Sequence, residues 1–326
     1  MRRPLSLSQK YAATALPLFL FFANALPAQI TPEQRLAHAY ALEREGKPEQ
    51  TIVELNALLD TKSLDTHGIG KAWNVLGLAY EDQGHYVESQ HAYQISIRTF
   101  ESLPDHTKDY AMVLDDLGGL YLEAGQPKLA FKLRKKAFGL YETSKDHAGM
   151  SRTSNNLAGV ALTLNNRDEG RKYLERAGRE AQMTSDLDGD DLAALASMQA
   201  WLAQLNGDLT TSVSRYKQSL ALLIKRHGEE HPFTGWGYML LGRAHAAMGE
   251  SMTALTEMNQ GRAILHRTLN NENPRYLTAE IAYSHVLDLT GAHQEAAQIR
   301  ADATRRLKEE DSRQCGGCTV SATAFR

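Results

Sequence analysis

The stretch WNVLGLAYEDQGHYVESQHAYQIS, Trp73–Ser96, decides the fold because its residue types recur along the chain at fixed spacing. A small residue, Gly77, stands among large apolar ones, and Gly84 follows seven residues later. Two more small residues, Ser89 and Ser96, follow twelve and nineteen residues after Gly77. Glycine readily takes the left-handed backbone that ends a helix, and small side chains let two helix axes approach closely. The stretch therefore predicts two helices in an antiparallel hairpin.

Seven copies of this pattern follow one another. The first small position is occupied, at intervals of 38, 41, 40, 42, 42 and 42 residues, by Ala39, Gly77, Gly118, Ala158, Ala200, Gly242 and Ser284. The helix-ending position holds Gly46, Gly84, Gly125, Asn165, Gly207, Gly249 and Gly291. The next small position holds Thr51, Ser89, Ala130, Gly170, Ser212, Ala254 and Ala296. The last holds Ser96, Ala137, Ala177, Ser219, Gly261 and Ala303, with Leu58 as the exception. We predict an all-α fold, an α-solenoid of about seven antiparallel helix pairs.

These residues resemble a known repeat. The set Trp73, Leu76, Gly77, Tyr80, Gly84, Ser89, Tyr93 and Ser96 is similar to the tetratricopeptide repeat, and the resemblance covers residues 31–309. The interval near 42 residues, and the segment SNNLAGVALTLNN at Ser154–Asn166, resemble the long repeats of kinesin light chain and its bacterial relatives. The resemblance implies a right-handed superhelix with a concave groove lined by the first helix of each pair.

The two ends of the chain differ from the repeats. Residues 1–25 place basic residues before an apolar run and end in Ala23-Asn24-Ala25, which predicts a cleaved secretory signal peptide; an uncleaved membrane anchor is the alternative. We therefore expect an exported protein, periplasmic or secreted if bacterial, with no membrane association after cleavage. Residues 310–326 form a tail with Cys315 and Cys318. This pair predicts a disulfide or a tail element, with thiol–disulfide chemistry as the alternative.

The charge balance limits the class of partner. Loss of Arg2, Arg3 and Lys10 with the signal peptide would leave 33 basic residues against 39 acidic ones, a formal net charge of −6. Nucleic acids and anionic membranes attract basic faces, so we expect neither as the partner.

The stretch HGEEHP, His227–Pro232, contains H-x-x-E-H, the inverted zinc-peptidase pattern. Zinc binding of that type needs both histidines on one face of a continuous helix, and Gly228 and Pro232 both disfavour helix there. The same place before other repeats is occupied by Asp105-His106, Asp146-His147 and Glu272-Asn273-Pro274. We interpret the stretch as a connector in which the acid, histidine or proline caps and starts the next helix. A metal site is the alternative.

In the tetratricopeptide family, positions six, three and two residues before the first small residue, and one and four after it, face the groove. In this chain they include Lys71, Asn74, Glu81, Asp115, Asp116, Arg152, Asn155, Asn156, Trp201, Gln204, Trp236, Met239, Arg243, His285 and Asp288. We predict peptide binding by Asn74, Glu81, Asp115, Arg152, Asn155, Asn156, Trp201, Trp236 and Arg243. Amides donate and accept, so they suit a peptide backbone, while tryptophan and arginine often dominate binding energy. Alternatively, the asparagines bond neighbouring helices and the tryptophans belong to the core. Arg134 and Arg300 are expected to lie along apolar surface with their heads in water.

The sequence thus predicts a non-catalytic exported scaffold that binds a peptide or protein segment in its concave groove. No catalytic residue, cofactor or metal is predicted, and self-association is left open. The alternative is a thiol–disulfide or metal-dependent accessory protein that uses Cys315 and Cys318 or the scattered histidines.

Overall fold

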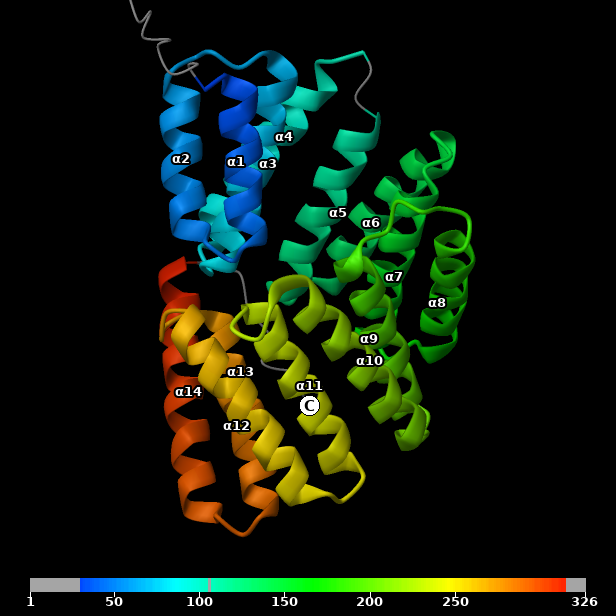
Figure 1. Cartoon of the computed structure of the whole chain (residues 1–326), viewed down its shortest axis with the longest axis vertical. Helices are drawn as coiled ribbons and strands as arrows, with labels where there is room; N and C mark the ends of the chain where they lie inside the picture. The colour runs from blue at the N-terminus through cyan, green and yellow to red at the C-terminus, as the bar shows by residue number, and fades with distance from the viewer. Residues whose placement is uncertain (1–29, 105–106, 315–326) are drawn as a thin grey trace, which may run out of the picture. The chain divides into compact units, whose positions relative to one another are not determined.

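The computed structural model describes residues 30–104 and 107–314, and these form fourteen α-helices with no strand (Figure 1). The helices are α1 (Pro32–Arg44), α2 (Pro48–Asp60), α3 (Thr66–Asp82), α4 (Tyr86–Glu101), α5 (Thr107–Glu123), α6 (Pro127–Thr143), α7 (His147–Thr163), α8 (Arg167–Ala181), α9 (Gly189–Leu205), α10 (Leu209–His227), α11 (Pro232–Ala247), α12 (Ser251–Thr268), α13 (Pro274–Leu289) and α14 (His293–Gln314). The all-α prediction is confirmed. Backbone contacts separate two units, Met1–Thr31 and Pro32–Arg326, and every described helix belongs to the second.

The helices form two layers. Each odd-numbered helix packs against the even-numbered helix that follows it, and each even-numbered helix packs against the next odd-numbered one. Odd-numbered helices also contact one another, from α1 through α9 and again between α11 and α13. In Figure 1, α2, α8 and α14 lie at the outer edges, with α1, α7 and α13 on their inner sides. The described chain is therefore a solenoid of seven helix pairs with the odd-numbered helices as its inner layer.

The predicted helix-ending residues have the backbone that the turn requires. All seven have a positive φ, from 60° at Asn165 to 91° at Gly291. At Gly84, for example, the backbone N–H donates to the carbonyl of Glu81 at 2.9 Å, and that of His85 donates to Tyr80 at 2.8 Å. The turn thus satisfies carbonyls at the end of α3 and reverses the chain into α4.

The small residues lie where the two helices of a pair meet. A Cβ atom on Gly77 would lie 2.4 Å from Cε1 of Tyr93, and one on Gly242 would lie 2.4 Å from Cγ of Met258. The hydroxyl of Ser89 donates to the carbonyl of Gly77 at 2.8 Å. A side chain at Gly77 would prevent these close contacts. The small residues therefore recur for the reason predicted from the sequence, which is that they let two helix axes approach closely.

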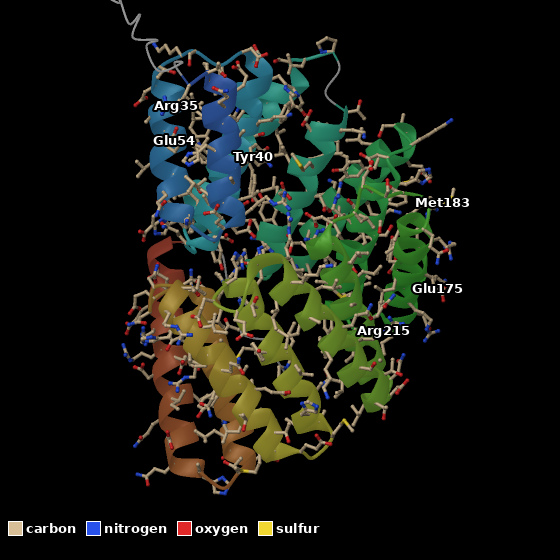
Figure 2. All side chains as sticks on the ribbon, viewed as in Figure 1. Arg35, Tyr40, Glu54, Glu175, Met183 and Arg215 are labelled. Atoms are coloured by element: carbon tan, nitrogen blue, oxygen red, sulfur yellow. The ribbon has the colours of Figure 1, made fainter. Side chains whose placement is uncertain are left out.

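The first pair shows why Leu58 departs from the pattern. In the second pair, Ser96 donates to the carbonyl of Gly70, seven residues before Gly77. The corresponding residue of the first pair is Pro32, where α1 only begins. No earlier turn of α1 therefore lies opposite Leu58, which leaves room for its large side chain, and this side chain is fully buried. An ion pair of 2.8 Å between Arg35 and Glu54 also joins α1 to α2 (Figure 2).

The connectors between pairs cap the helices of the inner layer. Side chains at the N-cap accept hydrogen bonds from the backbone in five of these helices, through Asp65, Asp146, Asp188, His231 and Asn273. Pro232 and Pro274 are the first residues of α11 and α13. The connector interpretation is confirmed at Asp146, His231 and Asn273, whereas Asp105 and His106 lie outside the described residues.

Some predictions concern parts of the chain that the structure does not describe. The signal peptide at residues 1–25 and the pair Cys315 and Cys318 lie outside the described residues and stay predictions. The last helix continues to Gln314, beyond the expected solenoid end at Glu309. Among residues 30–104 and 107–314, no helix has the length and apolar character needed to cross a bilayer.

We predict that Gly77→Ala lowers the free energy of unfolding by about 1–3 kcal/mol, because its Cβ would overlap the buried ring of Tyr93. The matched control is Gly139→Ala in α6, where nothing lies within 4 Å of the new Cβ; alanine should be neutral or stabilise that helix. Urea unfolding followed by circular dichroism measures both. Equal effects of the two substitutions would contradict the close approach at Gly77.

Candidate functional site

The inner layer closes on itself where the ends of α1 and α3 meet the starts of α11 and α13. We call this junction the seam. Across it, Asn273 Nδ2 donates to the carbonyl of Asp82 at 2.6 Å, although the two residues are 191 positions apart. A Cβ on Gly84 would lie 2.4 Å from Cδ of Pro274, and a Cβ on Gly46 would lie 3.0 Å from Nε2 of His231. The left-handed turn glycines of the first two pairs therefore also leave room for the helix starts of the last two.

One arginine holds the seam together electrostatically. Arg275, the second residue of α13, places its guanidinium 3.2 Å from Glu81 and 2.9 Å from Glu123, and it also pairs with Asp82. Burial lowers the pKa of Arg275, but the charges of Glu123, Asp82 and Glu81 outweigh burial and hold that pKa well above its ordinary value. Three carboxylates from α3 and α5 thus share one cation from α13.

A second set of ion pairs links α1 to the acidic loop before α9. Arg44 Nη2 lies 2.5 Å from Asp188 Oδ2, and Arg226 Nη2 lies 3.3 Å from the same oxygen. His227 Nε2 lies 2.5 Å from Asp190 Oδ1. Asp188 also forms a capping box at the start of α9 with Asp191. The acidic loop thus starts a helix, and its carboxylates pair with basic groups of α1 and α10.

The histidines of HGEEHP do not lie on one helix. His227 ends α10, Gly228 follows with a φ of 84°, and His231 caps α11 by accepting a hydrogen bond from the N–H of Phe233. The two imidazole rings stack with centroids 4.1 Å apart. Burial, together with the neighbouring His227, lowers the pKa of His231 to about 4, so its neutral ring serves as an acceptor. The inverted zinc-peptidase geometry, with both histidines on one helical face, is therefore not what this stretch forms.

Hydrogen bonds between amides and carboxylates join successive helices of the inner layer. Asn74 Nδ2 on α3 donates to Asp116 on α5 at 3.1 Å. Asn156 Nδ2 on α7 donates to Asp115 on α5 at 2.7 Å. These partners lie 42 and 41 residues apart, one repeat in each case. The alternative interpretation, that asparagines here bond neighbouring helices, therefore describes Asn74 and Asn156.

The predicted peptide-binding residues differ in accessibility. Four are less than a tenth exposed, namely Asn74, Glu81, Asp115 and Asn155. Arg152 is exposed but pairs with Asp191 at 3.1 Å. The partly exposed ones are Asn156, Trp201, Trp236 and Arg243. Hydrogen bonds connect Asn74 and Asn156 to carboxylates of α5, among them Asp115. Trp236 lies at the seam instead, where it lines a small cavity with Arg275. Peptide contact by these residues stays a prediction.

Arg134 corrects one expectation. Its side chain is buried rather than water-facing: Nη1 donates to the carbonyl of Asn156 at 3.1 Å, and Nε lies 3.6 Å from Asp115. Room for it exists because Gly118 and Gly119 lack side chains; their Cβ atoms would lie 2.9 Å and 3.3 Å from Arg134. Arg300 differs, because its side chain remains about a third exposed (34%) and donates to Ser284.

Two carboxyl groups of the inner layer have no cation of their own. The carboxyl of Glu43 on α1 makes no hydrogen bond or ion pair among the described residues, and that of Asp116 accepts from Asn74. Burial, together with the charges of Asp82 and Asp116, raises the pKa of Glu43 to about 8. Burial, together with the charge of Asp115, raises the pKa of Asp116 to about 7. Both acids therefore titrate near neutral pH.

The sequence reasoning missed Glu43 and Arg275. Glu43 stands four residues after Ala39, the same offset that placed Glu81 in the groove, so the repeat contained the signal. Arg275 had no such signal, because its partners Glu81 and Asp82 come from a repeat about 190 residues earlier.

We predict that Arg275→Ala destabilises the fold by on the order of 2 kcal/mol at neutral pH. Breaking a fully buried ion pair costs roughly 3–5 kcal/mol of stability, and we expect less here because the Arg275 side chain is 22% exposed. The loss should shrink in acid, where protonated carboxyls no longer need the cation. Arg215→Ala, on the outer surface of α10, is the control (Figure 2). Thermal unfolding that is the same for both variants would contradict a stabilising role of Arg275.

We also predict that wild-type stability falls as pH rises from about 5 to 8. Carboxyl groups of the unfolded chain lose their protons near pH 4, whereas Glu43 and Asp116 of the folded protein keep theirs up to about pH 8 and 7. Between these pH values the folded state binds more protons than the unfolded state, so the free energy of unfolding falls as pH rises. Glu43→Gln should flatten this slope and raise the melting temperature at pH 8. Glu175→Gln, which is exposed on α8, should leave the slope unchanged (Figure 2). A slope in Glu43→Gln that is as steep as in the wild type would contradict the assignment to Glu43, since only the part due to Asp116 should remain.

Comparisons with known proteins agree with this architecture. Residues 68–143 match the family model described as a tetratricopeptide repeat. None of the curated proteins compared with the chain matches it. The solved structure of NprR in complex with its cognate peptide NprX has a TM-score of 0.61 at 15% identity and covers 87% of this chain and 80% of that one. A Rap protein complexed with competence and sporulation factor has a TM-score of 0.57 at 11% identity and covers 87% and 98%. BtubC (BKLC) from P. vanneervenii has a TM-score of 0.46 at 17% identity and covers 72% and 90%. Residues 68–143 therefore match the tetratricopeptide repeat in sequence, and the described chain is similar in fold to NprR and the Rap protein.

Proposed function

We propose that this protein is a non-catalytic, exported scaffold that binds an extended peptide or protein segment along its inner layer. The observation that carries the proposal is the composition of that layer. The layer combines polar groups of α3, α5 and α7 with two half-buried tryptophans, Trp201 of α9 and Trp236 of α11. Aromatic side chains of this kind supply much of the energy at binding surfaces, while polar neighbours pair with a peptide backbone.

The comparisons support the same function. Two proteins with similar folds, NprR and a Rap protein, were solved in complex with the peptide NprX and with competence and sporulation factor, respectively. Repeat solenoids of this kind act through the extended surface that their stacked helices create. Export is supported by the signal-like residues 1–25, and cell fractionation with and without these residues tests it.

The second hypothesis, a thiol–disulfide or metal-dependent accessory protein, has less support. Its cysteines, Cys315 and Cys318, lie outside the described residues. Among the described residues, no group of three or more potential ligands can hold a metal ion. Replacing both cysteines by serine should leave partner capture intact in a scaffold and abolish activity in a thiol protein.

We predict that Trp201→Ala reduces partner capture by about tenfold or more, because loss of an aromatic anchor costs on the order of 2 kcal/mol of binding energy. Crosslinking in the native cell, followed by quantification of what is captured, measures the effect. The matched control is Val53→Ala on α2, a helix of the outer layer, where the side chain is 70% exposed. Equal capture by both variants, with both folded, would count against binding along the inner layer.

Asn155 and Asn156 require separate tests. Asn155→Ala should weaken capture, since its Oδ1 has no partner within the described chain. Asn156→Ala should also destabilise the fold by about 1–3 kcal/mol, because it leaves the buried Asp115 without a donor. Thermal unfolding alongside capture separates these effects. Unchanged capture by Asn155→Ala would remove that residue from the proposed surface.

A further inference from the structure

The inner layer near the seam carries more negative than positive charge. Four carboxyl groups, Glu43, Glu81, Asp82 and Glu123, lie near one guanidinium, Arg275, and a fifth, Asp116, lies near Glu43. Fully ionised, the six groups would have a surplus of four negative charges.

The neighbouring acids are already paired. Asp115 pairs with Arg134, Asp191 with Arg152, and Asp109 with both His67 and Lys71. Arg134 and Arg152, which lie near Asp116, thus form their ion pairs with Asp115 and Asp191, and Arg44, next to Glu43, forms its ion pair with Asp188. The excess negative charge therefore lies on the surface formed by α1, α3 and α5, opposite the start of α13.

A buried amide beside Asp116 has an oxygen atom without a hydrogen-bond donor. Asn74 is 1% exposed, and its Nδ2 donates to Asp116. The Oδ1 atom of the same amide is buried without any hydrogen bond. A buried acceptor without a donor is costly, so a ligand that donates here would gain free energy. This acceptor stands next to the carboxyl group that has no cation.

Aromatic side chains lie near the acidic residues at the seam. Glu43, Asp82, Arg275 and Trp236 line one small cavity of about 20 Å³. Tyr40 lies three residues before Glu43 on α1, hence on the same helical face, and is partly exposed. Carboxylates combined with aromatic faces bind organic cations, through ion pairing and through attraction to the ring. This cavity has about the volume of one small group, so only the tip of a side chain would enter it.

We infer that this surface selects a peptide segment carrying a lysine or arginine side chain, whose cation lies against Glu43 and Asp116 beside Trp236. The inference rests on the proposed function and specifies its ligand class. A bare metal ion fits less well, because no three potential metal ligands of the described chain converge. An acidic ligand would add to the surplus and be repelled.

The titration of the two acids supports this choice of ligand. Glu43 faces Asp82 on α3, Asp116 on α5, Arg275 on α13 and Arg44 on its own helix. Asp116 faces Asp115, Asn74, Arg134 and Arg152. Burial holds the pKa of Glu43 and of Asp116 near or above neutrality, and a bound cation would lower both. Ligand binding should therefore release protons and strengthen between pH 6 and 8, roughly the range in which these acids titrate.

The experiment uses the immobilised protein and a library of degenerate hexapeptides. Sequencing of the retained peptides should show enrichment of lysine or arginine at one position. A retained peptide is then compared with its norleucine counterpart, which keeps the alkyl chain and lacks the charge. Wild type should bind the norleucine peptide at least tenfold more weakly. The isosteric variants Glu43→Gln and Asp116→Asn, tested singly and together, should reduce that difference, whereas Glu175→Gln should retain it.

The outcomes separate this inference from the proposed function. Retained peptides without basic enrichment, or with acidic enrichment, would overturn the inference and leave the scaffold function standing. Retention of no peptide at all would overturn both. A lysine preference that is unchanged in the folded Glu43→Gln/Asp116→Asn double variant would also overturn it, because the cation would then bind elsewhere. Circular dichroism of each variant verifies the fold.

Discussion

The structure depends on the close approach of two helices at positions that carry almost no side chain. At Gly77 and Gly242 the partner helix fills the space that a Cβ would occupy. At Ser89 the one polar atom present donates back to the neighbouring helix, so a small polar residue fits without leaving a group unsatisfied. Because this contact is repeated in seven pairs, small rotations between pairs add up along the chain. Closure of the inner layer at the seam results from that sum.

The seam brings buried charges together at the ends of helices. Taking Glu81, Asp82 and Glu123 out of water is unfavourable, and a single guanidinium offsets only part of that cost. Well-packed apolar residues could join the same helix ends with less electrostatic cost. We therefore regard the charges as a source of specificity: only the start of α13, with Arg275 in place, satisfies these carboxylates, which fixes where the solenoid meets itself.

Much of the fold was predictable because the decisive signals are local. Left-handed residues such as Gly84 and Asn165 end helices through their own backbone, and Asp146 caps a helix through the next three residues. The site was predictable only in part. Offsets within a repeat located Glu81 and could have located Glu43. The pairing of Arg275 with Glu81 could not be read from any repeat, because it depends on the rotation accumulated across the four helix pairs that lie between them.

The uncompensated acids connect the closure of the solenoid with its binding surface. Asp82 is common to both, since it pairs with Arg275 and lines the cavity with Glu43 and Trp236. In the absence of another cation, protons neutralise Glu43 and Asp116, because burial favours their uncharged forms. A ligand cation would replace those protons and attract Asp82 as well, and so would compete with Arg275 for it. Ligand binding and the strength of the seam are therefore coupled through one carboxylate, and each must change the free energy of the other by the same amount.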